Sequence, residues 1–221
     1  MRDTLFFPLA TILAGVFVFT ALQPFVDRPP RGPLSGGGRN AEDVTVQGRE
    51  LNRFLPGSYD GIKIITPPGG GDQVLQITRT ADEVYESPRS GPNIVLAEDL
   101  EWAFESRPVE VVITARSAGD FPASKFEADY LARPDAESGW QTFDLTPEFK
   151  PYSFTYKVPA RGPTEGYDYI GVRPVVPDKH RVMEVKSIRI HVMGPKTKDV
   201  PEAPPTAPAQ APATSPAPAP H

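Results

Sequence analysis

Residues Val109 to Val158 read VEVVITARSAGDFPASKFEADYLARPDAESGWQTFDLTPEFKPYSFTYKV. Three segments of this stretch alternate apolar and polar residues, with the apolar positions at 109, 111, 113 and 115, then 126, 128 and 130, then 152, 154, 156 and 158. A period of two is that of a β-strand with one buried face. The stretch therefore predicts antiparallel β-structure, in which the dry face of each sheet is covered by a second sheet.

Shorter strands are predicted on both sides of this stretch. Turn sequences such as PGSYDG at 56–61 and PPGGGD at 67–72 separate them, and residues 50–55 are interpreted as a short helical turn or an irregular crossing. The predicted strands are 44–47, 62–66, 73–78, 93–97, 167–176 and 181–192. Many short strands without a long helical pattern favour an all-β domain, an antiparallel β-sandwich of the jelly-roll type, over residues 41–195.

The final predicted strand changes its buried face part-way along. Met183 and Val185 share one parity, whereas Ile188, Ile190 and Val192 share the other. One extra residue at Lys186-Ser187 would restore a continuous apolar face. We therefore predict a β-bulge at that point.

Composition and charge argue against several kinds of partner and site. The chain of 221 residues carries a net charge of −5, which argues against a nucleic-acid partner, and it has no cysteine, which excludes disulfides and thiolate metal sites. Its three histidines, at 180, 191 and 221, lack metal-ligand spacing, so no cofactor is predicted. The acidic run 98–101 between two predicted strands is interpreted as a solvated turn, with a structural calcium site as the alternative.

An uncharged apolar segment at 5–26, LFFPLATILAGVFVFTALQPFV, follows a short tail of residues 1–4. As a helix it would span roughly 33 Å, enough for a bilayer core. We interpret it as a transmembrane signal-anchor, and the alternative is a cleaved signal peptide. Counting Lys and Arg hardly decides the orientation. We favour a single-pass inner-membrane protein whose domain faces the periplasm.

Two segments lack an apolar face to bury. Residues 27–40, DRPPRGPLSGGGRN, are predicted to be a Pro/Gly-rich linker. Residues 196–221 are almost entirely Pro and Ala at their end and are predicted to be a disordered, extended tail that acts as a solvated spacer or a docking peptide.

Several strand phrases resemble those of non-catalytic carbohydrate-binding modules and of galactose-binding-like jelly rolls. They are VVITARS at 111–117, GWQTF at 139–143, YSFTYKVP at 152–159, YIGVRP at 169–174 and VKSIRI at 185–190. The resemblance covers residues 90–193. It implies a β-sandwich and, with less specificity, a polysaccharide ligand, because proteins that share a fold differ in function.

Sugar binding needs exposed aromatic rings for stacking and polar side chains for the hydroxyl groups. The candidate ligand-binding residues are Tyr167, Tyr169, Arg173, Arg116 and Trp140. For Trp140 a core position is the competing interpretation, and for Arg116 a surface ion pair. Trp102 and Phe104, and likewise Tyr130, are expected to face the core.

No nucleophile elbow, His-Glu-x-x-His motif or P-loop is present in the sequence, so no enzymatic activity is predicted. Two functions remain. The chain displays a glycan-binding domain at the membrane, or it is an accessory subunit that docks on another envelope protein.

Overall fold

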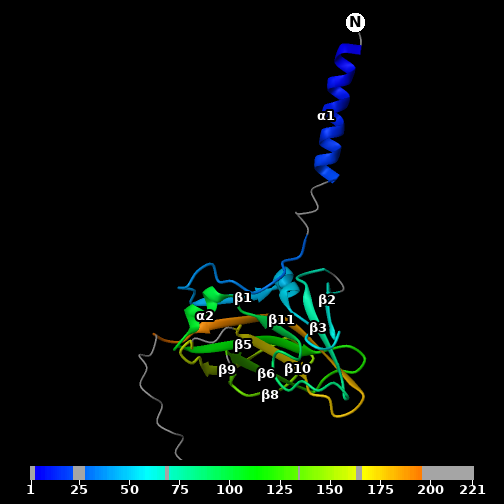
Figure 1. The fold of residues 1–221 in the computed structure, drawn as a ribbon. Helices are drawn as coiled ribbons and strands as arrows, with labels where there is room; N and C mark the ends of the chain where they lie inside the picture. The colour runs from blue at the N-terminus through cyan, green and yellow to red at the C-terminus, as the bar shows by residue number, and fades with distance from the viewer. Residues whose placement is uncertain (1–2, 22–27, 68–69, 134, 163–165, 196–221) are drawn as a thin grey trace, which may run out of the picture.

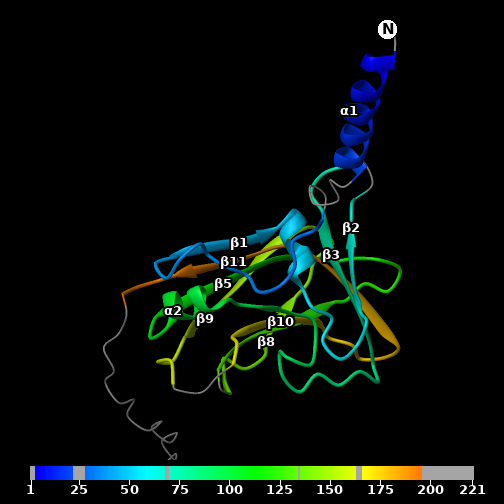
Figure 2. The same ribbon diagram turned by 45° about the horizontal axis from the view of Figure 1, so that its top comes forward.

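The structure, a computed structural model, describes residues 3–21, 28–67, 70–133, 135–162 and 166–195. Two antiparallel sheets face each other and form a β-sandwich (Figures 1 and 2). The six-stranded sheet contains β1 (Asp43–Gln47), β2 (Ile62–Ile65), β3 (Val74–Thr80), β5 (Pro108–Ser117), β9 (Lys150–Lys157) and β11 (His180–Val192). The five-stranded sheet contains β4 (Asn93–Val95), β6 (Lys125–Ala132), β7 (Ala136–Glu137), β8 (Gln141–Asp144) and β10 (Tyr169–Pro174).

The predicted β-sandwich is confirmed, including each strand expected from the sequence. In the first sheet the order is β2-β3-β11-β5-β9, with β1 also paired to β11, and in the second it is β4-β10-β6-β7, with β8 paired to β6. A short 3-10 helix, η1 (Gly48–Arg53), occupies the region predicted as a helical turn or crossing. The jelly-roll connection pattern goes beyond these pairings and stays a prediction.

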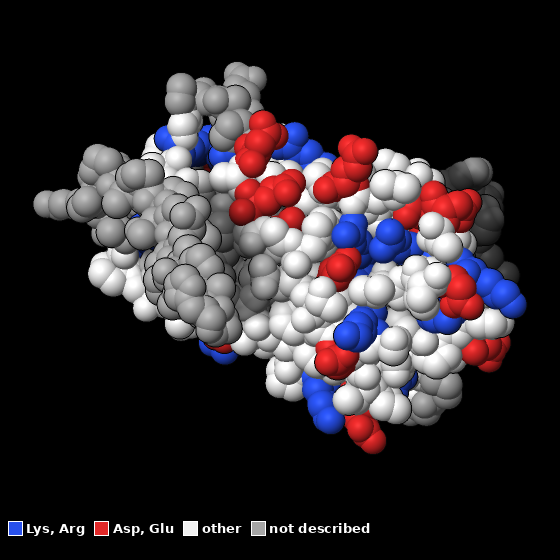
Figure 3. Space-filling view, turned by 90° about the horizontal axis from the view of Figure 1, so that it is seen from below, with Lys and Arg blue, Asp and Glu red and all other residues white. Residues whose placement is uncertain are grey.

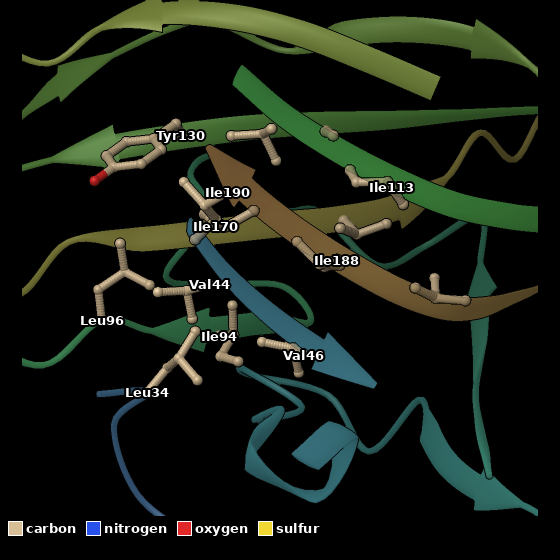
Figure 4. Packing of buried hydrophobic residues seen from close by; sticks show 14 of the residues in the cluster. Leu34, Val44, Val46, Ile94, Leu96, Ile113, Tyr130, Ile170, Ile188 and Ile190 are labelled. Carbon is tan, nitrogen blue, oxygen red and sulfur yellow. The ribbon is translucent and has the colours of Figure 1, made fainter. Parts of the chain in front are cut away.

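The apolar positions of the period-two pattern are buried or half-buried in all three segments, although on β6 the polar position Asp129 is buried as well. Along β5 the residues alternate between buried and half-buried, and the buried ones are Val109, Val111, Ile113 and Ala115. Apolar side chains from both sheets and from the connecting segments form one core, part of which Figure 4 shows around Ile113, Ile170 and Ile188. Each sheet therefore buries one face against the other.

The predicted β-bulge is confirmed on β11. Pairing with β5 runs from Met183 to Val185, shifts, and resumes at Ser187. Lys186 is exposed, while Val185 and Ile188 on either side of the shift are both buried. The extra residue allows one long strand to keep its apolar side chains in the core.

Residues Glu98–Phe104 form a helix, α2, and not the solvated turn that the acidic run predicted. Leu100, Ala103 and Phe104 are fully buried, and their spacing of three and four residues is helical. Trp102 and Phe104 therefore do not share a face as they would in a strand. Phe104 is in the core, and Trp102 is half-buried at the surface.

The end of the predicted 27–40 linker is packed onto the domain. Leu34 is buried, its N–H donates to the Val95 carbonyl at 2.8 Å, and its carbonyl accepts from Ala97 N–H at 2.7 Å. The Asp99 carboxylate accepts hydrogen bonds from Gly36 N–H at 3.0 Å and Gly38 N–H at 3.1 Å. The linker prediction, made from composition alone, missed these contacts. The residues that Leu34, Gly36 and Gly38 contact lie more than 60 positions further along the chain, on α2 and just before it.

The N-terminal helix α1 (Asp3–Ala21) stands apart from the sheets in Figure 1. Its large apolar side chains from Leu9 to Phe19 are exposed. Among the described residues, no helix combines the length and the apolar character needed to cross a bilayer. The anchor predicted over 5–26 thus gains no support here, and the predicted disordered tail at 196–221 lies outside the described residues.

Candidate functional site

A buried ionic cluster lies where α2 meets the end of β6 and the start of β10. The Arg133 guanidinium forms an ion pair with the Glu101 carboxylate, and its Nε lies 3.8 Å from Asp168 Oδ1. All three side chains are at most 5% exposed. Buried charges persist only when they are paired and hydrogen-bonded, so these residues hold α2 against the sandwich as a unit.

Hydrogen bonds complete this cluster. Asp168 accepts from the backbone N–H of Arg133 at 3.1 Å and from the Tyr130 hydroxyl at 2.9 Å. Its own N–H donates to Glu101 Oε1 at 3.2 Å. Burial raises the pKa of the Asp168 carboxyl, and the hydrogen bonds and Arg133 oppose that shift. Tyr130 is in the core as predicted, and burial raises the pKa of its hydroxyl well above the usual value.

Above the cluster, two guanidinium groups contact the indole ring of Trp102. Arg39 lies 4.7 Å and Arg161 lies 4.6 Å from the ring centroid. The indole N–H donates to Glu98 Oε1 at 3.2 Å, and Arg161 donates to the same oxygen at 3.3 Å. These contacts lower the pKa of the Glu98 carboxyl, the Trp102 hydrogen bond most of all, so Glu98 is ionised at neutral pH.

An open pocket of about 310 Å³ lies over the ionic cluster, with Arg161 and Glu98 in its lining. Its lining combines an aromatic ring, two guanidiniums and two carboxylates, and the residues are Glu98, Glu101, Arg133, Arg161, Gly166 and Tyr167. The Tyr167 side chain is 50% exposed. An exposed ring next to charged hydrogen-bonding groups matches what a sugar ring requires, namely a stacking surface and partners for hydroxyl groups.

Of the five predicted site residues, the structure places only Tyr167 at this pocket. Tyr169, Arg173 and Trp140 come together elsewhere, on the outer face of the five-stranded sheet. The Arg173 guanidinium lies 3.7 Å from the Trp140 ring centroid and donates to Glu127 at 2.7 Å and to the Tyr85 carbonyl. Tyr167 has the same parity as Tyr169 and Arg173, but it precedes β10 and lines the pocket described above.

The segment 85–92 covers that outer face. Tyr85 and Pro88 are buried, and the Arg89 guanidinium lies 5.4 Å from the Tyr169 ring centroid. The Arg173 side chain is only 13% exposed as a result. Protein guanidinium groups thus lie against the rings of Tyr169 and Trp140, and Arg173 itself donates to protein oxygens. That these three residues bind a ligand stays a prediction.

Because Gly171 has no side chain, the segment 85–92 can pack closely on the outer face of the sheet. A Cβ atom at this position would lie 2.9 Å from Pro88 and 3.1 Å from the far edge of the Trp140 ring. We expect Gly171→Ala to destabilise the domain by about 1–3 kcal/mol through overpacking and to change the environment of Trp140. Urea unfolding followed by tryptophan fluorescence measures both effects. An unchanged free energy of unfolding would contradict the close packing.

Arg116 lies in the other sheet, on β5, away from both groups. It donates to Glu184 at 2.8 Å, and its guanidinium lies 4.4 Å from the Phe149 ring centroid. An ion pair, one of the two interpretations of this residue, is observed, but its Glu184 side chain is only 7% exposed, so the pair is partly buried. Arg116 is consequently not part of the pocket.

Sequence reasoning missed the polar residues of the pocket. Arg133 and Arg161 carry no local signal, because an isolated arginine in a loop or at a strand end is usually a solvated residue. Glu98 and Glu101 were noticed but assigned to a turn. The apolar spacing Leu96, Leu100 and Phe104 could have indicated the helix that carries them.

One face of the molecule carries charges of both signs (Figure 3). On the face shown in Figure 3, basic and acidic side chains lie side by side, with several acidic groups gathered near one edge. Within the described part of the chain, no group of three or more His, Cys, Asp or Glu side chains could hold a metal ion. The alternative of calcium at 98–101 is also disfavoured, because Glu101 pairs with Arg133 and Asp99 is hydrogen-bonded to the glycine-rich segment.

Comparison with known proteins gives only distant structural likenesses. No family model and no curated protein sequence match the chain. The xylan-binding CBM22-2 domain of Paenibacillus barcinonensis Xyn10C is similar at a TM-score of 0.49 and 11% identity, covering 68% of this chain and 99% of that one. The CBM22-1 and GH10 modules of Clostridium thermocellum xylanase 10B, complexed with xylohexaose, are similar at a TM-score of 0.43 and 13% identity. That match covers 66% of this chain and 27% of the other.

A third similar structure is the C-terminal CBM6 of LamC from Zobellia galactanivorans, with a TM-score of 0.36 and 11% identity, covering 67% of this chain and 98% of that one. At these scores and identities the likenesses carry no argument about a ligand. The function below therefore rests on the pocket itself.

Proposed function

We propose that this chain is a non-catalytic glycan-binding protein that holds a short stretch of polysaccharide in the pocket beside Tyr167. The observation that carries the proposal is a half-exposed aromatic ring bordering a pocket that is otherwise lined by guanidinium and carboxylate groups. At about 310 Å³ the pocket lies at the small end of the range for ligand sites, which is roughly 300–1,000 Å³.

Each lining group has a role in this proposal. The Tyr167 ring offers an apolar surface to one face of a sugar ring. Arg161, whose side chain is 20% exposed, offers hydrogen-bond donors to the ligand, and Glu98, whose side chain is 65% exposed, pairs with Arg161 in the free protein. Arg133 and Glu101 are more deeply buried and fix the floor of the pocket.

Tyr167→Ala is expected to weaken polysaccharide binding about fivefold to tenfold, since a stacked ring contributes about 1–1.5 kcal/mol. Tyr167→Phe keeps the ring and should bind nearly as well as the native protein. Affinity electrophoresis against a panel of neutral and acidic polysaccharides measures the change. The full chain is kept in a nonionic detergent without a sugar headgroup, because α1 exposes apolar side chains.

Phe121→Ala is the matched control, since Phe121 is an aromatic residue that is 42% exposed and lies outside the pocket. It should leave retardation in the gel unchanged. Equal loss of binding in Phe121→Ala and Tyr167→Ala would contradict a site at Tyr167. Retardation by no polymer would favour the other function considered from the sequence, an accessory subunit that docks on an envelope protein.

Attachment to a membrane through residues 5–26, with the domain on the periplasmic side, stays a prediction of the sequence. Fractionation of cells that express the full chain tests it. Recovery in the membrane fraction after alkaline carbonate washing would support it, and recovery in the wash would contradict it.

A further inference from the structure

The way Glu98 is held at the pocket indicates the chemical class of the glycan. Arg161 Nη1 lies 3.3 Å from Glu98 Oε1, and Arg161 Nη2 lies 3.9 Å from Glu101 Oε2. The Glu101 carboxylate is already engaged by Arg133 and by the Asp168 N–H. The charge of Arg161 is therefore balanced mainly by Glu98, whose side chain is the exposed member of the pair.

A second cation, the Arg39 guanidinium, lies beside the indole ring of Trp102, which Arg161 also contacts. The exposed Arg39 belongs to the segment 36–41, which lines another open pocket, of about 340 Å³. Asp99, the nearest other acid on α2, is occupied by Ser35 and by the N–H groups of Gly36 and Gly38. Among the described residues, Glu98 is thus the exposed carboxylate that is bonded to both Arg161 and the Trp102 indole, beside which Arg39 also lies.

This arrangement suits a carboxylate carried by the ligand. If Glu98 rotates into solvent, Arg161 presents a planar pair of donors to another carboxylate, which guanidinium binds in a two-pronged geometry. A uronic acid residue supplies such a carboxylate together with the sugar ring face that Tyr167 would stack against. A neutral sugar offers nothing that could replace Glu98 in this way.

We propose that the ligand is an acidic polysaccharide whose uronate carboxylate displaces Glu98 from Arg161, with Arg39 adding to the attraction across Trp102. This inference rests on the proposed glycan-binding function of the same pocket. Glu98 acts as an internal competitor, so removing its charge strengthens binding. Because the contact is between charges at a partly open surface, added salt weakens it.

The test measures binding of the full chain to polygalacturonate, alginate and hyaluronan, each paired with its carboxyl-reduced, neutral form. We expect at least one uronate polymer to bind at least tenfold more tightly than its reduced form. Glu98→Gln should tighten that binding about two- to fivefold, since an exposed ion pair is lost in the free protein and its glutamine oxygen can still accept from Trp102. Arg161→Gln should weaken binding about tenfold.

Glu148→Gln, which neutralises an exposed carboxylate outside the pocket, should leave the affinity unchanged. Equal binding of acidic and neutral polymers, or no gain in Glu98→Gln, would overturn the uronate inference. If binding to the neutral forms is nevertheless lost in Tyr167→Ala, the proposed glycan-binding function still stands. If the full chain binds none of these polymers and none of the wider panel, both fail.

Discussion

Replacement of Arg133 by methionine is expected to destabilise the domain by about 3–5 kcal/mol at neutral pH. The substitution keeps an unbranched apolar side chain but leaves the buried Glu101 and Asp168 carboxylates without their cation. A substitution that leaves a buried charge without a partner lowers the free energy of unfolding more than most other single changes. Urea-induced unfolding of the native and variant chains at pH 7 measures the loss.

The destabilisation should depend on pH in a defined direction. Burial already raises the pKa of Asp168 above its unfolded value near 3.8, and Arg133 opposes that shift. Without Arg133 the folded pKa rises further. A group with a raised folded pKa favours the folded state at low pH and loses that contribution as the pH rises through the folded pKa. The difference between variant and native protein should therefore shrink as the pH falls from 7 toward 4.

A second substitution separates charge from packing. Glu101→Gln added to Arg133→Met removes one of the uncompensated charges while its amide oxygen can still accept from Asp168 N–H. The double variant should be more stable than Arg133→Met alone. If it is no more stable, the cost of Arg133→Met comes from lost packing, and the ionic interpretation of the cluster is wrong.

Phe126→Ala is expected to cost a comparable amount, about 3–5 kcal/mol, through a cavity between the two sheets. Phe126 on β6 is fully buried. Its ring stacks on Phe143 of β8 with centroids 5.0 Å apart and meets the edge of Tyr152 at 5.2 Å. Tyr152 belongs to β9 of the opposite sheet. Removal of the Phe126 ring therefore leaves a cavity where the two sheets contact each other.

Phe121→Ala again provides the matched comparison, five residues earlier in the chain. Its ring is 42% exposed and packs on His180, with centroids 4.1 Å apart. We expect a loss below about 1 kcal/mol, as for other substitutions at the surface. Thermal and urea unfolding of both variants measures the contrast. Similar losses at the two positions would mean that Phe126 does not bridge the sheets as described.

The strands and the bulge could be read from the sequence because their signals are local. Whether a residue lies on the wet or dry face of a strand depends on its parity, so the alternation in 109–115 and the change of parity after Val185 both correspond to the observed structure. The helix α2 was missed for a related reason. It has only seven residues, too few for its periodicity to outweigh the acidic run that suggested a turn.

The site could be read only in part. Tyr167 is exposed at the pocket, whereas the Arg89 and Arg173 guanidinium groups lie against the rings of Tyr169 and Trp140, the other two aromatic candidates. Side-chain type and strand parity indicate which face of a sheet a residue occupies. They do not indicate whether a distant segment, here 85–92, covers that face.

What the sequence determined by itself was thus the sandwich, its apolar faces and the position of its bulge, since each follows from the order of neighbouring residues. The tertiary structure alone decided the pocket. Glu98, Arg133 and Arg161 come from α2, the end of β6 and a loop, and they meet because buried charges require partners wherever the fold can supply them. Because these partners are separated by tens of residues, no periodic pattern in the sequence predicts that they pair.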